Sequence, residues 1–172
     1  MSMTSPLTSN EYNEYYKRYI DLAISAPLLE GLATGMLETH EFFESIPNEK
    51  LEFRYAEGKW TPKQILLHII DTERVFAYRA LQFSRASNVE IKGFDQDEFA
   101  ANSNADNRSQ DSLLKEYMAV RTSSILLFKS FNEATLKRMG EASNFPLSVR
   151  ASGYIICGHE KHHIKIIKER YL

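Results

Sequence analysis

Few features of this sequence cross-link the chain or interrupt its helices. A single cysteine, Cys157, excludes an internal disulfide and favours a reducing compartment. The formal net charge of -2 gives no overall electrostatic reason to bind nucleic acid. The densest apolar stretch, residues 65–70, includes a histidine and is far too short to span a membrane. No basic stretch followed by an apolar run marks the amino-terminus, so we expect a cytoplasmic protein.

Glycine and proline are also scarce, at seven and five residues in 172, which leaves room for long helices. Apolar residues at helical spacing predict a short amino-terminal helix and four longer ones, at residues 11–24, 27–45, 62–84, 111–131 and 147–171. The best-marked start is Thr61-Pro62, with a threonine cap and proline at the first helical position. The remaining segments predict an extended stretch and two loops, at residues 53–60, 86–110 and 140–146.

Strand signals are weak, so we predict an all-α fold with one domain over residues 1–172. Four helices of around 20 residues, each about 30 Å long, suit an antiparallel four-helix bundle. The polar residues 1–10 are expected to be loosely held.

Two histidines stand four residues apart in the last predicted helix. This spacing places His159 and His163 on one helix face, where two imidazoles can chelate one divalent cation. Their face also carries Ile155, Ile156 and Ile166, so the pair lies in an apolar stripe where bare imidazoles need partners. The pattern is therefore a stronger indication of a metal site than a pair of exposed histidines would be.

A third histidine, His68, lies in the almost wholly apolar segment 65–70 of another predicted helix. Facing side chains of separate helices meet in a bundle core, which commonly hosts metal sites. A single core histidine is usually structural. Together, His68, His159 and His163 predict a divalent metal site with an open position, with zinc or nickel as the metals expected first.

The segment 159–163 also matches H-E-x-x-H, the zinc-protease helix in which the glutamate is the general base. We discount a protease because no histidine follows His163 and Glu169 is too near in sequence to fold back as a ligand. His162 is one position off the best face and is expected to flank the site. Cys157 is out of phase with His159 and is expected to be a small packed residue.

Four segments together resemble the DinB superfamily, in particular its branch of YfiT-like metal-dependent hydrolases. They are residues 60–73 (WTPKQILLHIIDTE), 93–97 (GFDQD), 120–121 (VR) and 158–163 (GHEKHH). The resemblance implies an up-down-down-up four-helix bundle, often a homodimer, with a metal held by His68, His159 and His163. Characterised members use low-molecular-weight thiols, which makes such a thiol a candidate partner.

Two activities and one non-catalytic role remain open from the sequence. The first is transfer of a small thiol to an electrophilic small molecule, and the second is hydrolysis at the same metal. The third is a non-catalytic metal-binding stress-response protein. For catalysis we expect Glu160 and Asp71, with Glu73, to act as bases or to support the ligands, and Arg121 to bind an anionic group. Each of these side chains has the alternative of a solvated charge or an internal ion pair. The loop 93–99 is expected to edge the site.

Overall fold

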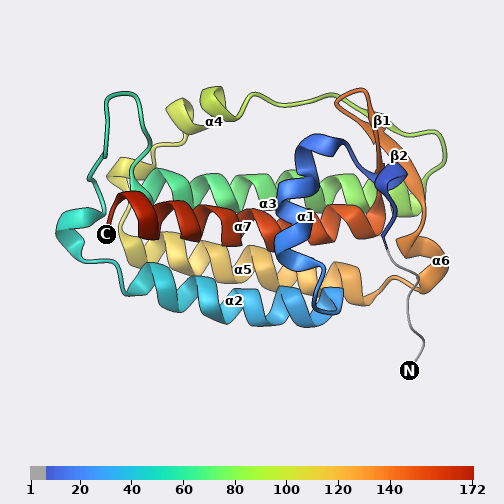
Figure 1. Ribbon diagram of the computed structural model, residues 1–172, viewed down its shortest axis with the longest axis horizontal. Coiled ribbons are helices and arrows are strands. Elements are labelled where there is room, and N and C mark those ends of the chain that lie inside the picture. The colour runs from blue at the N-terminus through green and yellow to red at the C-terminus, as the bar shows by residue number, and fades with distance from the viewer. Residues whose placement is uncertain (1–6) are drawn as a thin grey trace.

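The computed structural model describes residues 7–172, which form a bundle of long helices capped by a small sheet (Figure 1). Four long helices make the bundle: α2 (Leu28–Glu44), α3 (Pro62–Arg85), α5 (Gln110–Lys129) and α7 (Val149–Arg170). Three shorter helices accompany them: α1 (Lys17–Ala23), α4 (Gln96–Asn102) and α6 (Glu133–Leu136). The five helices expected from the sequence are therefore present, although the first is shorter than predicted.

The four long helices run in the up-down-down-up order. In Figure 1, α2 and α7 run towards the end that holds the carboxyl-terminus, while α3 and α5 run the opposite way. Each of α2 and α3 packs against both α5 and α7. Within residues 7–172 no single helix is long and apolar enough to cross a membrane. The pair Glu14–Ala23 and Leu28–Glu44, bent by 78°, passes that test only when taken together.

Polar side chains fix where the site-bearing helices begin. Thr61 accepts a hydrogen bond from the Gln64 backbone N–H, and the Gln64 side chain accepts one from the Thr61 N–H. This capping box, with Pro62 in the first turn, confirms the start predicted for α3. Ser148 caps α7 in a similar way by accepting a hydrogen bond from the Ala151 N–H. Both caps set the register of the histidine-bearing helices.

A three-stranded sheet lies at one end of the bundle, in the order β1 (Glu90–Ile91), β2 (Met139–Ala142), β3 (Phe145–Ser148). The prediction of a plain loop at residues 140–146 was wrong, because β2 and β3 form an antiparallel hairpin. Ser143 and Asn144 both have positive φ, 57° and 66°, which is the turn geometry that suits a two-residue hairpin. The predicted loop 86–110 likewise contains β1, α4 and the 3-10 helix η4 (Ala105–Asn107).

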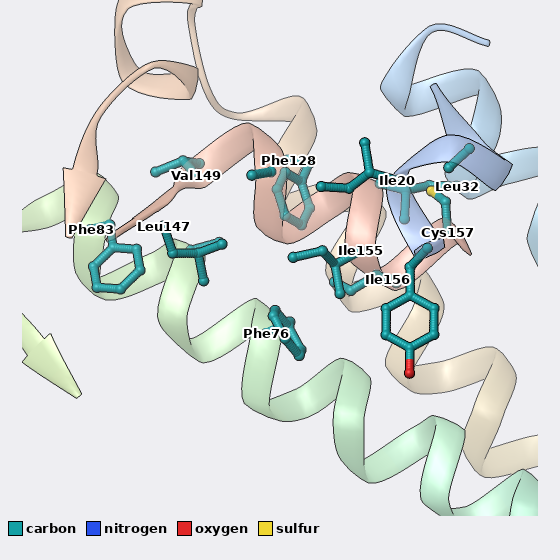
Figure 2. Packing of buried hydrophobic residues seen from close by; sticks show 14 of the residues in the cluster. Ile20, Leu32, Phe76, Phe83, Phe128, Leu147, Val149, Ile155, Ile156 and Cys157 are labelled. Atoms are coloured by element: carbon teal, nitrogen blue, oxygen red, sulfur yellow. The ribbon is translucent and has the colours of Figure 1, made fainter. Parts of the chain in front are cut away.

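Two apolar clusters fill the core. Figure 2 shows part of the cluster nearer the sheet, where Phe76 of α3 lies opposite Ile155 and Ile156 of α7. The other cluster lies towards the opposite end and includes Leu66, Ile70, Leu113 and Ile167, among others. On α3, α5 and α7, charged residues and one histidine occupy positions between the two clusters: Glu73, Arg121, and His159 and Glu160. His68 lies on α3 among the residues of the second cluster. The core therefore contains a polar layer.

The amino-terminal segment lies across the bundle and packs on α7. A Cβ added to Gly158 would lie 1.8 Å from the backbone oxygen of Tyr19, so only glycine permits this approach of α1 to α7. Before α1, Glu11 of the 3-10 helix η1 (Ser9–Glu11) accepts a hydrogen bond from Arg150 Nε at 2.7 Å. Residues 9–10 belong to this 3-10 turn, and the expectation that residues 1–10 are loosely held stays a prediction. Residues 1–6 of that prediction lie outside the described residues.

Candidate metal centre

The three histidines selected from the sequence meet in the polar layer. Nε2 of His159 lies 3.0 Å from Nε2 of His68 and 3.0 Å from Nε2 of His163. Their candidate ligand atoms all lie within 4.8 Å of one another. A tetrahedral zinc ion with Zn–N bonds of 2.0–2.1 Å separates its ligand nitrogens by about 3.3 Å. The two separations of 3.0 Å are therefore close to the spacing at a shared metal, while the 4.8 Å bound for the set is wider.

One proton on His159 Nε2 cannot satisfy both of its contacts, with His68 and with His163. A neutral imidazole presents Nε2 either as one N–H or as one lone pair, so His159 Nε2 can make a good hydrogen bond to only one neighbour. The other Nε2 atom then faces it at 3.0 Å without a proper partner. A cation placed among three lone pairs satisfies all of them together, so these residues fit a divalent metal.

Burial keeps the triad unprotonated at neutral pH. It lowers the pKa of His68 to about 4. It also lowers the pKa values of His159 and His163 well below the usual value, and the neighbouring imidazoles add to the effect. Lone pairs on neutral imidazoles are what a zinc or nickel ion requires. The protein therefore presents ligands in the correct protonation state without help from a metal.

Aromatic rings hold the triad in place. The Tyr19 ring packs edge-on against His159 with 5.3 Å between centroids, and the Trp60 ring lies 4.7 Å from that of His68. Thr72 Oγ1 makes a long contact of 3.5 Å with the other nitrogen of His68. These contacts restrict ring rotation, which is how residues beyond the ligands orient a metal site.

The triad opens on a cavity of about 220 Å³ on the side of His68 and His159. Aromatic rings dominate its walls, and its other sides are polar or aliphatic: Tyr15, Tyr16, Tyr19, Phe76, Phe94, Thr72, Arg79, Gln96, Ser143 and Ile155. Phe94 and Gln96 come from segment 93–99, which lies at the edge of the site as expected. A second hollow of about 240 Å³ is lined by His162 and His163, among others. A small molecule in the first cavity would contact the exposed side of the metal position.

Arg121 and Glu160, expected to act in catalysis, meet in a fully buried ion pair. Arg121 donates to both oxygens of Glu73 at 2.8 and 2.9 Å and to both oxygens of Glu160 at 3.0 and 2.6 Å. Tyr117 donates a further hydrogen bond of 2.8 Å to Glu160. A Cβ on Gly35 would lie 2.1 Å from Glu160 Oε1, so this position of the carboxylate requires glycine in α2. Their catalytic role stays a prediction, and these contacts favour a structural one.

The remaining predicted residues do not line the cavity beside His68 and His159. Asp71 pairs with Arg74 at 3.2 Å and is absent from the walls of both hollows. Burial raises the pKa of Asp71 despite that arginine. Cys157 is buried as expected, and burial raises its pKa to about 12. His162 flanks the triad, with its ring centroid 5.3 Å from that of His163.

Comparison with known proteins agrees with this fold. A family model of the DinB superfamily matches residues 36–167, most of the chain. The chain belongs to the DinB superfamily. One similar solved structure is YfiT from Bacillus subtilis, described as a probable metal-dependent hydrolase with an unusual four-helix bundle topology. It shares 16% identity with a TM-score of 0.73, covering 95% of this DinB-superfamily chain and 89% of YfiT. No curated protein matches the sequence significantly.

Sequence reasoning missed part of the cavity wall of this DinB-superfamily protein. Tyr19, in the wall of the first cavity, comes from a segment that carries no ligand pattern, and Trp60, in the wall of the second hollow, begins the segment 60–73 without itself carrying a signal for contact with His68. Arg79 did carry a signal, because it continues the apolar stripe of His68, Thr72 and Phe76 at helical spacing and places a charge in it. Ser143 is brought in by a hairpin turn that the sequence did not predict.

Proposed function

We propose that this DinB-superfamily protein is a metal-dependent enzyme that joins a low-molecular-weight thiol to a small electrophile in the cavity beside His68 and His159. The observation that carries the proposal is the convergence of three neutral Nε2 atoms on one point at a cavity wall. A divalent cation held there lowers the pKa of a thiol or water in its open position. The ligands would be His68, His159 and His163.

Among the described residues, no cysteine thiol lines the cavity beside His68 and His159. Cys157 is buried, its pKa is raised to about 12, and it does not line either hollow beside the triad. An attacking thiol must therefore come from solution. In the proposed reaction the thiol gives its proton to water and a sulfur–carbon bond forms. The bond between that carbon and the leaving group breaks, and the leaving group departs with its electron pair.

One feature favours a thiol over water as that nucleophile. Among the described residues, no carboxylate lines the cavity that contacts His68 and His159. Glu160, the expected base, has both oxygens occupied by Arg121 and one also by Tyr117. Hydrolysis at a metal commonly uses a nearby general base, whereas a thiol is already acidic enough to need less assistance. The description of YfiT as a probable hydrolase keeps water as the second candidate.

Metal content tests the first part of the proposal. Wild-type protein should hold stoichiometric zinc or nickel by mass spectrometry, and His159→Ala should hold little. The matched control is His162→Ala, which removes the neighbouring imidazole outside the triad and should keep the metal. Added zinc should raise the Tm of metal-free wild type but not that of His159→Ala. Equal metal loss in both variants, or no metal in the wild type, would contradict the site.

Thiol dependence tests the second part. Zinc-loaded protein is mixed with an activated aryl chloride in the presence and absence of a small thiol such as cysteine or bacillithiol. Thioether formation above the uncatalysed rate should require protein, thiol and an intact triad. Turnover to the hydroxylated product at a rate that ignores added thiol would remove the transferase and support the hydrolase.

A further inference from the structure

Arg79 is a buried cation at the wall of the metal-side cavity. Only 1% of its surface is exposed, although it lines the same cavity as His68 and His159. It stands eleven residues after His68 on the inward stripe of α3, about 16 Å along the helix axis. Helical side chains lean towards the amino-terminus, which brings the long Arg79 side chain back in the direction of His68.

The guanidinium of Arg79 has few partners for a buried charge. Nη2 donates to Ser143 Oγ at 3.2 Å, and the group lies 4.7 Å over the Phe76 ring. Nε is buried and has no hydrogen-bond partner. Among residues 7–172 no carboxylate forms an ion pair with Arg79, whereas the buried Arg121 is paired with both Glu73 and Glu160.

A buried arginine without a counter-ion is unfavourable unless something else supplies the negative charge. The protein gives Arg79 a neutral hydroxyl and an aromatic face, so its charge is left uncompensated. Its position in a cavity wall makes an anion from solution the natural partner. The planar fork of N–H donors in a guanidinium matches a carboxylate with two parallel hydrogen bonds.

We propose that Arg79 binds the carboxylate of a small organic acid and holds its other end towards the histidine triad. Arg79 is the only cationic side chain among the described residues that line this cavity, so the site suits one negative charge. The rings of Tyr16, Phe76 and Phe94 favour an apolar or aromatic body. The orientation towards the triad rests on the proposed function, whereas the binding of the anion does not.

Calorimetric titration of metal-free protein with benzoate, hexanoate and acetate tests the site, with the uncharged amide of each acid as its control. Wild type should bind at least one acid, benzoate being expected best, and should bind its amide about 30-fold more weakly. Arg79→Met should lose the same factor, and Arg79→Lys should recover only part because it lacks the fork. Arg85→Met is the matched control, since it removes an exposed arginine from the same helix.

Stability separates a binding role from a structural one. Since Arg79→Met removes an uncompensated charge, its Tm should equal or exceed that of wild type. The proposal is overturned if no acid binds metal-free wild type, if acid and amide bind equally, or if Arg79→Met keeps its affinity. Tighter binding of inorganic phosphate than of any acid would also overturn it.

Two further outcomes concern the neighbouring site. Benzoate binding that requires added zinc, and persists in Arg79→Met, would place the carboxylate on the metal and refute the Arg79 site. Benzoate binding through Arg79, combined with failure of the wild type to take up added zinc or nickel, would refute the proposed function and leave the anion site intact.

Discussion

Replacing Arg121 by methionine should destabilise the protein more than any other single charge removal in it. The methionine side chain fills similar space but donates none of the five hydrogen bonds that Arg121 makes to Glu73, Glu160 and the Leu32 carbonyl. Although burial alone lowers the pKa of Arg121, the Glu160 and Glu73 carboxylates raise it well above its usual value. The two carboxylates therefore strongly stabilise the charged form of Arg121, and Arg121 in turn compensates their buried charges.

The magnitude follows from what the substitution leaves behind. Removing one partner of a buried ion pair costs about 3–5 kcal/mol, because the other charge stays buried without compensation. Here two carboxylates lose their common cation, so we expect at least that loss. This is a large part of the 5–15 kcal/mol that a domain typically has. For a chain of this size it lowers Tm by roughly 6–20 °C.

Urea and thermal unfolding followed by circular dichroism measure the effect. Arg74→Met is the matched control, because Arg74 also bridges two acids, Asp71 and Glu116, but its side chain is 48% exposed. We expect that control to lose less than about 1 kcal/mol. Adding Glu73→Gln and Glu160→Gln to Arg121→Met should restore part of the loss. A cost for Arg121→Met no greater than that of the control would refute the reasoning.

Three further predictions follow from local features. Burial alone raises the pKa of Glu11, but hydrogen bonds, chiefly from its arginine partner, lower it to about 2. Since its folded pKa is depressed, Glu11 stabilises the fold above about pH 5 and loses this contribution as the pH falls towards 2. Glu11→Gln should therefore lose about 2 kcal/mol at pH 7 and little at pH 2, measured by urea titration. Gly158→Ala should displace α1 and cost about 1–3 kcal/mol, whereas Gly31→Ala, whose added Cβ meets Cys157 Sγ at an ordinary 3.5 Å, should fold as well as wild type. Cys157 should react with an aromatic disulfide reagent only after denaturation, and rapid labelling of native protein would contradict its burial and raised pKa.

The long helices and the histidine triad were predictable because both depend on local spacing. The Thr61–Pro62 cap marks the start of α3 by the backbone chemistry of its first turn. An i, i+4 pair on an apolar stripe places His159 and His163 together whatever else the chain does. His68 could be added because its own stripe had to face the same core. The sequence thereby determined the four-helix architecture and the candidate ligands.

Tertiary structure alone decided whether the buried arginines Arg121 and Arg79 have an ionic partner. Arg121 and Arg79 both interrupt apolar stripes, and nothing in their local sequence separates them. The packing of α5 between α2 and α3 brings Arg121 to Glu73 and Glu160, while the β2–β3 hairpin offers Arg79 only Ser143. Ion pairing depends on which distant segments come within a few ångströms, and that distance is set by the packing of whole helices and not by spacing along one of them.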